Sequence, residues 1–208
     1  MEDKIKQLFD NWRSRNISGF FCSSKHEAAE KILDFIPAEV SVGFSGSATL
    51  DQIGIIPLLE KRGNNIANPY RKDMSRQESL NIRKKGAQSD FYLASPNAIS
   101  AQGELVFFSA FGNRIAGVSY ADNVIIVSGV NKIVPDLGQA MKRARELAAP
   151  LNCKRLNWQA PCFPDGICRE NICRFPQYNR MCCQVLTIEA EAAPGRLRII
   201  LVEEDLGF

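Results

Sequence analysis

Five of the seven cysteines lie in one stretch, residues 162 to 183, with the sequence CFPDGICRENICRFPQYNRMCC. Cys162, Cys168, Cys173 and Cys182 are separated by five, four and eight residues. Thiolates are the ligands of zinc and of iron–sulfur clusters. The spacing misses the tight zinc knuckle and matches no standard cluster motif, but it is nearer to an iron–sulfur binding loop. We therefore expect these four cysteines to hold an iron–sulfur cluster or zinc.

Two other roles for the same cysteines remain open. Arg169, Arg174 and Arg180 flank the thiols, and nearby positive charge favours the thiolate form. This would suit a redox-reactive dithiol or a disulfide as well as a metal. Alternatively, the cysteines are free and pack as small apolar side chains.

A second candidate site is the stretch VGFSGSAT at residues 42–49, where an apolar strand leads through a Gly/Ser loop into a helix. Backbone N–H groups and the positive end of a helix dipole bind anions at such a junction. The loop lacks the Gly-Lys-Ser/Thr ending of a P-loop. The candidate anion-binding residues are Gly43, Ser45, Gly46, Ser47 and Thr49. The alternative is a tight turn that Ser47 caps.

Polar residues also follow two later apolar stretches. Asn97 and the Asn113-Arg114 pair come after predicted strands, where ligands collect in open α/β sheets. Arg114 can hold a carboxylate or phosphate through two parallel hydrogen bonds. The alternative is that both segments are hairpin turns.

Asn131 and Lys132 lie beyond the apolar strand at residues 123–129. A lysine there can neutralise an anionic substrate, or act as a nucleophile if its pKa is lowered. The composition favours the plainer interpretation, in which Asn131 caps a helix and Lys132 is a solvated surface residue.

The bulk composition excludes several classes of protein. The chain has 208 residues, of which 45% are hydrophobic and 24% charged, and a net charge of +3. These values are typical of a globular protein and give no indication of nucleic-acid binding. No apolar run is long enough to span a membrane, and the charged N-terminus is not a secretory signal. We expect a reducing, cytoplasmic location, where a His-based site is improbable because His26 is the only histidine.

Predicted strands and helices alternate along the chain. The expected strands cover residues 17–24, 39–44, 91–95, 104–110, 123–129, 184–190 and 196–204. Helices are expected near residues 5–12, 24–36, 74–90 and 134–150, with one more that opens in residues 45–55 and is kinked or divided at Pro57. This order predicts one α/β domain over residues 1–208 with a mainly parallel sheet, whose last two strands form an antiparallel edge. Residues 151–183 are expected to be a cysteine-rich insert.

Several of these motifs together resemble the LUD-domain family of the lactate-utilisation protein C type. The resemblance is carried by VGFSGSATLDQIGI, SDFYLASPNAISAQGELVFFSAFGNRIAG, NVIIVSGVNKIVPDLGQAM and the ending IILVEEDLGF. It implies a Rossmann-like fold with helices on both faces of the sheet. That fold is similar to the group of sugar-phosphate isomerases, CoA-transferases and formyltetrahydrofolate cyclo-ligases.

The resemblance also implies functional positions. It assigns anion contacts to the Gly/Ser loop and adds Glu104, Gly112 and Gly129 to the motif residues already named. Family members commonly have a glutamate where Gln52 stands here. Glu104 is then the remaining carboxylate in the matched motifs, and we expect Glu104 and Lys132 to be the catalytic candidates.

By this resemblance the chain is a component of a system that oxidises L-lactate to pyruvate with iron–sulfur protein partners, binding a small hydroxy or keto acid. Two alternatives stay open. One is an isomerase- or ligase-type enzyme acting on a small phosphorylated or acyl substrate, with acid/base work by Glu104 or Lys132. The other is a non-catalytic interaction module with structural cysteines. A homo-oligomer is also open.

Overall fold

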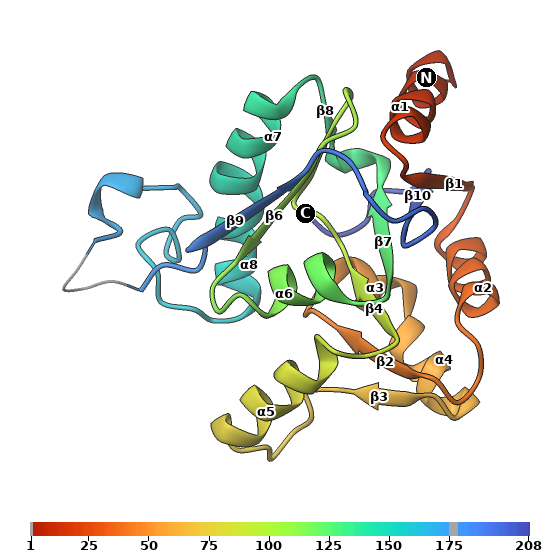
Figure 1. Cartoon of the computed structure of the whole chain (residues 1–208). Helices are drawn as coiled ribbons and strands as arrows, with labels where there is room; N and C mark the ends of the chain where they lie inside the picture. Colours follow the sequence, from red (N-terminus) through yellow and green to blue (C-terminus); the bar gives the residue numbers. More distant parts are fainter. Residues whose placement is uncertain (1, 175–178) are drawn as a thin grey trace.

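The computed structural model describes residues 2–174 and 179–208 (Figure 1). Its centre is a sheet of six parallel strands in the order β1-β10-β7-β4-β2-β3. The strands are β1 (Ser18–Cys22), β2 (Ser41–Phe44), β3 (Asn65–Ala67), β4 (Phe91–Ala94), β7 (Asn123–Gly129) and β10 (Leu197–Val202). The predicted α/β class with a mainly parallel sheet is therefore confirmed.

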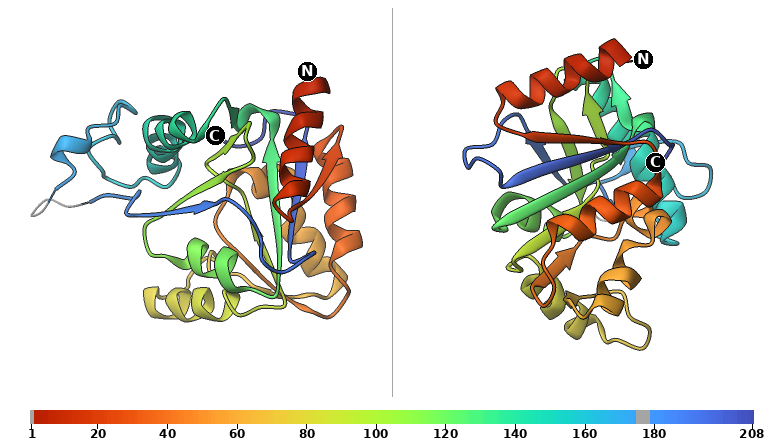
Figure 2. Two further views of the ribbon diagram at one scale, coloured as in Figure 1. Left: turned by 45° about the horizontal axis from the view of Figure 1, so that its top comes forward. Right: turned by 90° about the vertical axis from the view of Figure 1, so that its right-hand side faces the viewer.

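Helices cover both faces of this sheet (Figure 2). Helices α2 (Lys25–Phe35), α3 (Ala48–Ile53) and α4 (Ile55–Arg62) pack on one face, where they bury Ile32, Leu50 and Leu59. Helices α1 (Glu2–Ser14) and α6 (Asn113–Tyr120) pack on the other face, burying Leu8, Trp12 and Val118. Helix α5 (Arg76–Gly86) lies beside β2 and β3. No helix among the described residues has the length and apolar character needed to cross a bilayer.

A second sheet of four strands, not predicted from the sequence, lies against the α1 and α6 face. Its order is β8-β5-β6-β9, with bounds Ile133–Val134, Ala98–Ser100, Leu105–Ser109 and Gln184–Ile188. One long helical region packs on it through Ala140 and Ala144. That region consists of α7 (Leu137–Arg143), a π-helical segment (Ala144–Ala148) and α8 (Ala149–Arg155).

The structure corrects two predicted details. The last two strands do not form an antiparallel edge, because β10 pairs in parallel inside the first sheet while β9 pairs with β6 in the second. The helix after the Gly/Ser loop divides at Gly54, which adopts φ 72°, and not at Pro57. Pro57 lies in the first turn of α4, where its missing N–H costs no hydrogen bond.

The expected insert at residues 151–183 begins inside α8 and continues as an irregular excursion on one side of the molecule (Figure 1). Beyond the end of α8, the only regular piece among its described residues is the 3₁₀ turn Glu170–Ile172, labelled η3. Arg174 is the last described residue before the gap, and Asn179 is the first after it.

Gly43 and Gly86 let α5 approach β2 closely. A Cβ atom placed on Gly43 would lie 1.9 Å from the Gly86 carbonyl oxygen, whereas one placed on Gly86 would lie 3.4 Å from the Ala67 Cβ. The first contact is impossible without backbone movement, and the second is an ordinary van der Waals contact. Gly43 is therefore required by packing rather than by approach to a ligand.

The two glycines give a matched test of this packing. We expect Gly43→Ala to lower the free energy of unfolding by about 1–3 kcal/mol, because the added methyl overpacks the α5–β2 contact. Gly86→Ala should leave it unchanged or raise it by less than about 1 kcal/mol, because alanine favours the helix. Urea unfolding followed by circular dichroism measures both, and equal effects would contradict the proposed contact.

Candidate functional site

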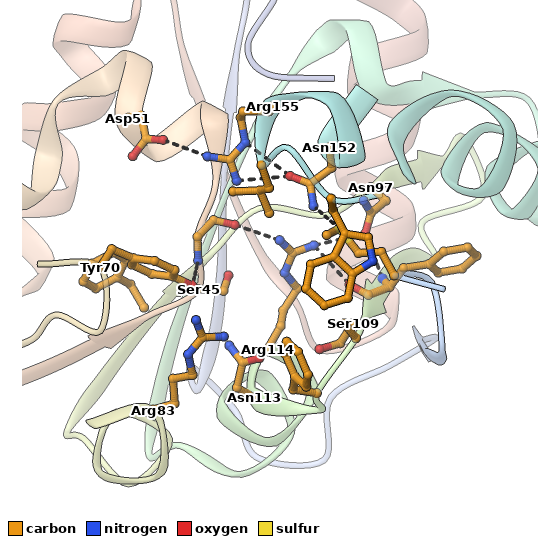
Figure 3. Close-up of a pocket in the computed structure, with 18 of the residues that line it drawn as sticks. Ser45, Asp51, Tyr70, Arg83, Asn97, Ser109, Asn113, Arg114, Asn152 and Arg155 are labelled. Atoms are coloured by element: carbon orange, nitrogen blue, oxygen red, sulfur yellow. Dashed lines mark hydrogen bonds and ion pairs between the residues drawn. The ribbon is translucent and has the colours of Figure 1, made fainter. Parts of the chain in front are cut away.

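A cavity of about 660 Å³, the main cavity, opens where the chain leaves β2, β4 and β6 (Figure 3). Its wall comes from the Gly/Ser loop, α5, the start of α6, and α8. The side chains labelled in Figure 3 include Ser45, Tyr70, Arg83, Asn97, Ser109, Asn113, Arg114, Asn152 and Arg155. The structure thus brings together Ser45, Gly46, Asn97, Asn113 and Arg114 of the residues predicted from the sequence.

Arg114 is half-buried and binds only uncharged acceptors. Its guanidinium donates to the Gly46 carbonyl at 2.9 Å, to Asn97 Oδ1 at 3.2 Å and to the Phe108 carbonyl at 3.2 Å. Burial lowers its pKa from the ordinary arginine value, although a guanidinium stays protonated in proteins. Arg114 therefore brings positive charge to the cavity wall without a counter-charge.

Arg83, on α5, is a second cation of the wall that sequence reasoning missed. Its Nε donates to Ser79 Oγ at 3.3 Å, and its guanidinium lies 5.2 Å from the Tyr70 ring and 5.9 Å from the Phe111 ring. Among the described residues, no carboxylate pairs with Arg83 or Arg114.

The other charges that line the main cavity are matched within the chain. Arg155 lies 3.5 Å from Asp51 and Arg71 lies 3.9 Å from Glu60. Among the described residues that line the main cavity, the positive charges without a carboxylate partner are thus Arg83 and Arg114.

Ser45 contributes an unused hydroxyl. Ser45 is buried, and its Oγ lies close enough to the Tyr92 hydroxyl to act on the pKa of Tyr92, but it makes no hydrogen bond of normal geometry within the described part of the chain. Leaving a buried hydroxyl unpaired costs free energy, so it indicates a missing partner. Nearby, Gly112 (φ 78°) is the N-cap residue of α6, and no side chain caps the first turn of that helix. The free N–H groups of such a turn favour an anion.

Most backbone N–H donors of the Gly/Ser loop are hydrogen-bonded to groups of the same chain. The Ser45 N–H donates to the Leu93 carbonyl and the Gly46 N–H donates to the Tyr70 hydroxyl. Ser47 accepts from the Leu50 N–H, which confirms the capped-turn interpretation for that residue. The loop therefore shapes the wall, while Arg83 and Arg114 supply charge without a carboxylate partner among the described residues, and the first turn of α6 supplies N–H groups that no side chain caps.

Lys132 is buried, so its interpretation as a surface lysine is wrong. Its Nζ donates to Ser95 Oγ at 2.8 Å, to Thr49 Oγ1 at 2.9 Å and to the Pro96 carbonyl at 3.2 Å. It lies in a cavity of about 20 Å³, whose lining shares Gly46, Asn97, Arg114 and Asn152 with the main cavity. Burial lowers the pKa of Lys132 well below its ordinary value, and the charges of Arg143 and Arg114 lower it further.

Glu104 and Asn131 are placed apart from both of these cavities. Glu104 accepts hydrogen bonds from Ser100 and from Arg15, the latter at 2.9 Å. Burial acts to raise the pKa of Glu104, but these hydrogen bonds and the Arg15 charge hold it below its usual value. Asn131 bonds the backbone of Leu206 and Gly207. The structure does not bring Glu104 and Lys132 together.

The four predicted cysteine ligands line a third cavity, the thiol cavity, together with Cys153 of α8. Within the described residues, Cys22, Cys153, Cys162, Cys168, Cys173 and Cys182 form no disulfide. Within residues 2–174 and 179–208, no group of three or more Cys, His, Asp or Glu side chains is arranged to hold a metal ion. Burial and the neighbouring thiols raise the pKa values of Cys153, Cys168 and Cys173. Sequence reasoning missed Cys153 because it lies in a helix, outside the cysteine-rich stretch.

The lowered pKa of Lys132 predicts a pH dependence of stability. In the unfolded chain Lys132 keeps its proton up to a pH of about 10.5, the ordinary lysine value. In the folded chain Lys132 loses that proton at a lower pH, because its pKa is lowered. Between these two pKa values the unfolded chain binds one more proton than the folded chain. Stability therefore rises with pH across that interval. Relative to Lys132→Met, we expect the free energy of unfolding of the unmodified chain to increase from neutral to alkaline pH, as measured by urea unfolding.

Lys142, exposed on α7, provides the control. Lys142→Met should leave the pH dependence of stability as it is in the unmodified chain. A difference between the unmodified chain and Lys132→Met that stays constant with pH would contradict the buried, deprotonating lysine.

Comparisons with known proteins agree with this architecture. A crystal structure of a DUF162 family protein from Deinococcus radiodurans superposes with a TM-score of 0.56 at 12% identity, covering 97% of each chain. Ribose 5-phosphate isomerase A from Neisseria gonorrhoeae (TM-score 0.34, 17% identity, 54% of each chain) is a more partial likeness. The same holds for ribose 5-phosphate isomerase from Plasmodium falciparum (0.32, 14%, 53% of this chain and 52% of that chain).

The sequence has no significant match among curated proteins. A family model for the LUD domain matches residues 5–202, nearly the whole chain. The chain therefore belongs to the LUD domain family.

Proposed function

We propose that the main cavity binds a small 2-hydroxy or 2-oxo acid, and that the chain is a component of a lactate-utilisation system. The observation that carries this proposal is the pair Arg83 and Arg114, which line one cavity without a carboxylate partner among the described residues. A bound carboxylate would supply that partner. It would also accept a hydrogen bond from the unpaired Ser45 hydroxyl.

The lining of the main cavity fits an organic acid better than an inorganic anion. Phe44, Phe111 and Trp158 give the wall apolar surface beside the two arginines. Sites for small organic molecules combine such apolar surface with a few polar groups that fix orientation. The volume of about 660 Å³ exceeds what lactate needs, so the acid occupies only the end near Arg83, Arg114 and Asn113.

Membership of the LUD domain family supports the lactate-utilisation role. Oxidation of L-lactate to pyruvate releases two electrons and two protons. In this proposal the two electrons pass to iron–sulfur protein partners, and this chain holds the acid while they are transferred.

A second candidate function is an isomerase- or ligase-type reaction on a phosphorylated or acyl substrate. It is favoured by Lys132, whose lowered pKa would make its amine a base at the edge of the main cavity. Its own cavity of about 20 Å³ admits roughly one water molecule, so a substrate reaches the amine only if the wall opens. This candidate is therefore ranked second.

Ligand binding tests the proposal. We expect lactate or pyruvate to raise the melting temperature of the chain, with an affinity measurable by calorimetry. Arg83→Gln should weaken this binding about tenfold, because it removes one charge-assisted hydrogen bond to the carboxylate. Arg83 is preferred to Arg114 for this test because Arg114 also ties the backbone together.

Arg76→Gln is the matched control, since Arg76 is exposed on the same helix and does not line the main cavity. Equal affinity in both variants would contradict the role of Arg83. Stabilisation by ribose 5-phosphate or acetyl phosphate in place of either acid would favour the second candidate. No response to any anion would favour a non-catalytic interaction module.

A further inference from the structure

The main cavity has room for much more than a bound carboxylate. Its volume of about 660 Å³ is typical of cavities that enclose a ligand of drug size. Arg83, Asn113 and Arg114 lie at one end of it (Figure 3). The rest of the lining therefore indicates what else the ligand carries besides its acid group.

The wall next to Arg83 is apolar. The Arg83 guanidinium lies 5.9 Å from the centroid of the Phe111 ring, and that ring meets the Trp158 ring edge to face at a centroid distance of 5.9 Å. Leu156, two residues before Trp158, lines the same cavity. Met181 also lines it and packs with Trp158 against one small core cluster. An apolar surface thus begins at the charged end and leads away from it.

Two side chains of this apolar surface are unusually exposed. Phe111 is 52% exposed and Leu156 is 46% exposed. A single exposed apolar residue needs no explanation, but neighbouring ones that line one cavity indicate a binding surface. The Trp158 indole N–H donates to the Asn179 carbonyl at 2.8 Å, so it needs no polar group from a ligand. An apolar group bound here would remove this surface from water.

The lining on the side of α4 has a different character. Asp51 and Glu60 line the cavity there, 3.5 Å from Arg155 and 3.9 Å from Arg71 respectively. Charged groups of this kind favour water over an apolar ligand group, because burying them against an apolar group costs free energy. The apolar part of a ligand therefore belongs on the side of Phe111.

We propose that the main cavity prefers 2-hydroxy or 2-oxo acids that carry an aromatic side chain, such as phenyllactate and phenylpyruvate. The preference rests on the proposed function, because the carboxylate lies at Arg83 and Arg114 while the ring packs on Phe111, Leu156 and Trp158. Lactate has the same acid group as phenyllactate but lacks the ring, so it leaves the apolar surface uncovered.

An aromatic ring suits this surface better than a branched aliphatic group. Aromatic pairs in edge-to-face or offset-stacked arrangements attract each other beyond the area that they bury. Phe111 and Trp158 already form such a pair, with an interplanar angle of 77°. The Arg83 guanidinium also lies near two rings, 5.2 Å from that of Tyr70 and 5.9 Å from that of Phe111. A ligand ring would extend this aromatic group.

Calorimetric titration of the full chain with L-lactate, phenyllactate and 2-hydroxyisocaproate tests the preference. We expect phenyllactate to bind at least about tenfold more tightly than lactate, because its ring buries apolar area. It should also bind more tightly than 2-hydroxyisocaproate, whose side chain is aliphatic. Phe111→Ala should weaken phenyllactate binding about fivefold and lactate binding less than about twofold. Leu156→Ala should act in the same direction.

Phe21 and Leu147 provide matched controls. They are 41% and 45% exposed, close to the exposure of Phe111 and Leu156, and they do not line the main cavity. Phe21→Ala and Leu147→Ala should therefore leave both affinities unchanged. Thermal unfolding without ligand shows whether each variant has folded, so that loss of binding is not mistaken for loss of structure.

Arg83→Gln separates the aromatic preference from carboxylate binding, since it should weaken lactate and phenyllactate binding by the same factor. Equal affinity for the two acids, or an equal loss of both in Phe111→Ala, would overturn the aromatic preference. The proposed function would still stand in that case if Arg83→Gln weakens lactate binding. Tighter binding of 2-hydroxyisocaproate than of phenyllactate would overturn the aromatic assignment, and no binding of any of the three acids would overturn both proposals.

Discussion

The architecture of the site depends on one half-buried arginine, Arg114. Arg114 binds the chain where it leaves β2, at Gly46, where it leaves β4, at Asn97, and at the end of β6, at Phe108. Three segments that are far apart in the sequence and belong to two different sheets are thereby fixed around a single side chain. Because all of its acceptors are uncharged, the arginine holds the wall together and still presents an uncompensated charge to the cavity. Structural support and the free positive charge of the cavity wall thus come from the same residue.

Patterns that depend on neighbouring residues were predictable from the sequence. The apolar spacing in residues 5–12 and the Ser24 cap correctly indicated α1 and α2, and the alternation of elements indicated a parallel sheet. The strand order was not predictable in the same way. β10 lies between β1 and β7, and nothing local in residues 197–202 distinguishes an inner strand from an edge strand. The second sheet was missed because β5 and β8 have three and two residues, too short to show a period.

The candidate site was predictable in part for a related reason. Asn97, Asn113 and Arg114 follow strands, and the ends of strands converge whatever the strand order. The burial of Lys132 depends instead on the C-terminal residues around Gly207, which are distant in the sequence. Arg83 and Cys153 lie on helices whose other residues are ordinary, so no local signal marks them. Tertiary contacts alone reveal these three residues.

The π-helical segment Ala144–Ala148 has a consequence for how the two cavities are separated. A π turn holds one more residue than an α turn, so every side chain beyond it is rotated by about 100° relative to an uninterrupted α-helix. The segment lies just before Pro150, whose ring would clash with the carbonyl four residues earlier in a regular helix. In α8 the resulting orientation directs Asn152 and Arg155 toward the main cavity and Cys153 toward the thiol cavity. Helix α8 thereby separates the two cavities and presents chemically different side chains to each. The direction in which its side chains point is set by the π-helical turn that precedes it.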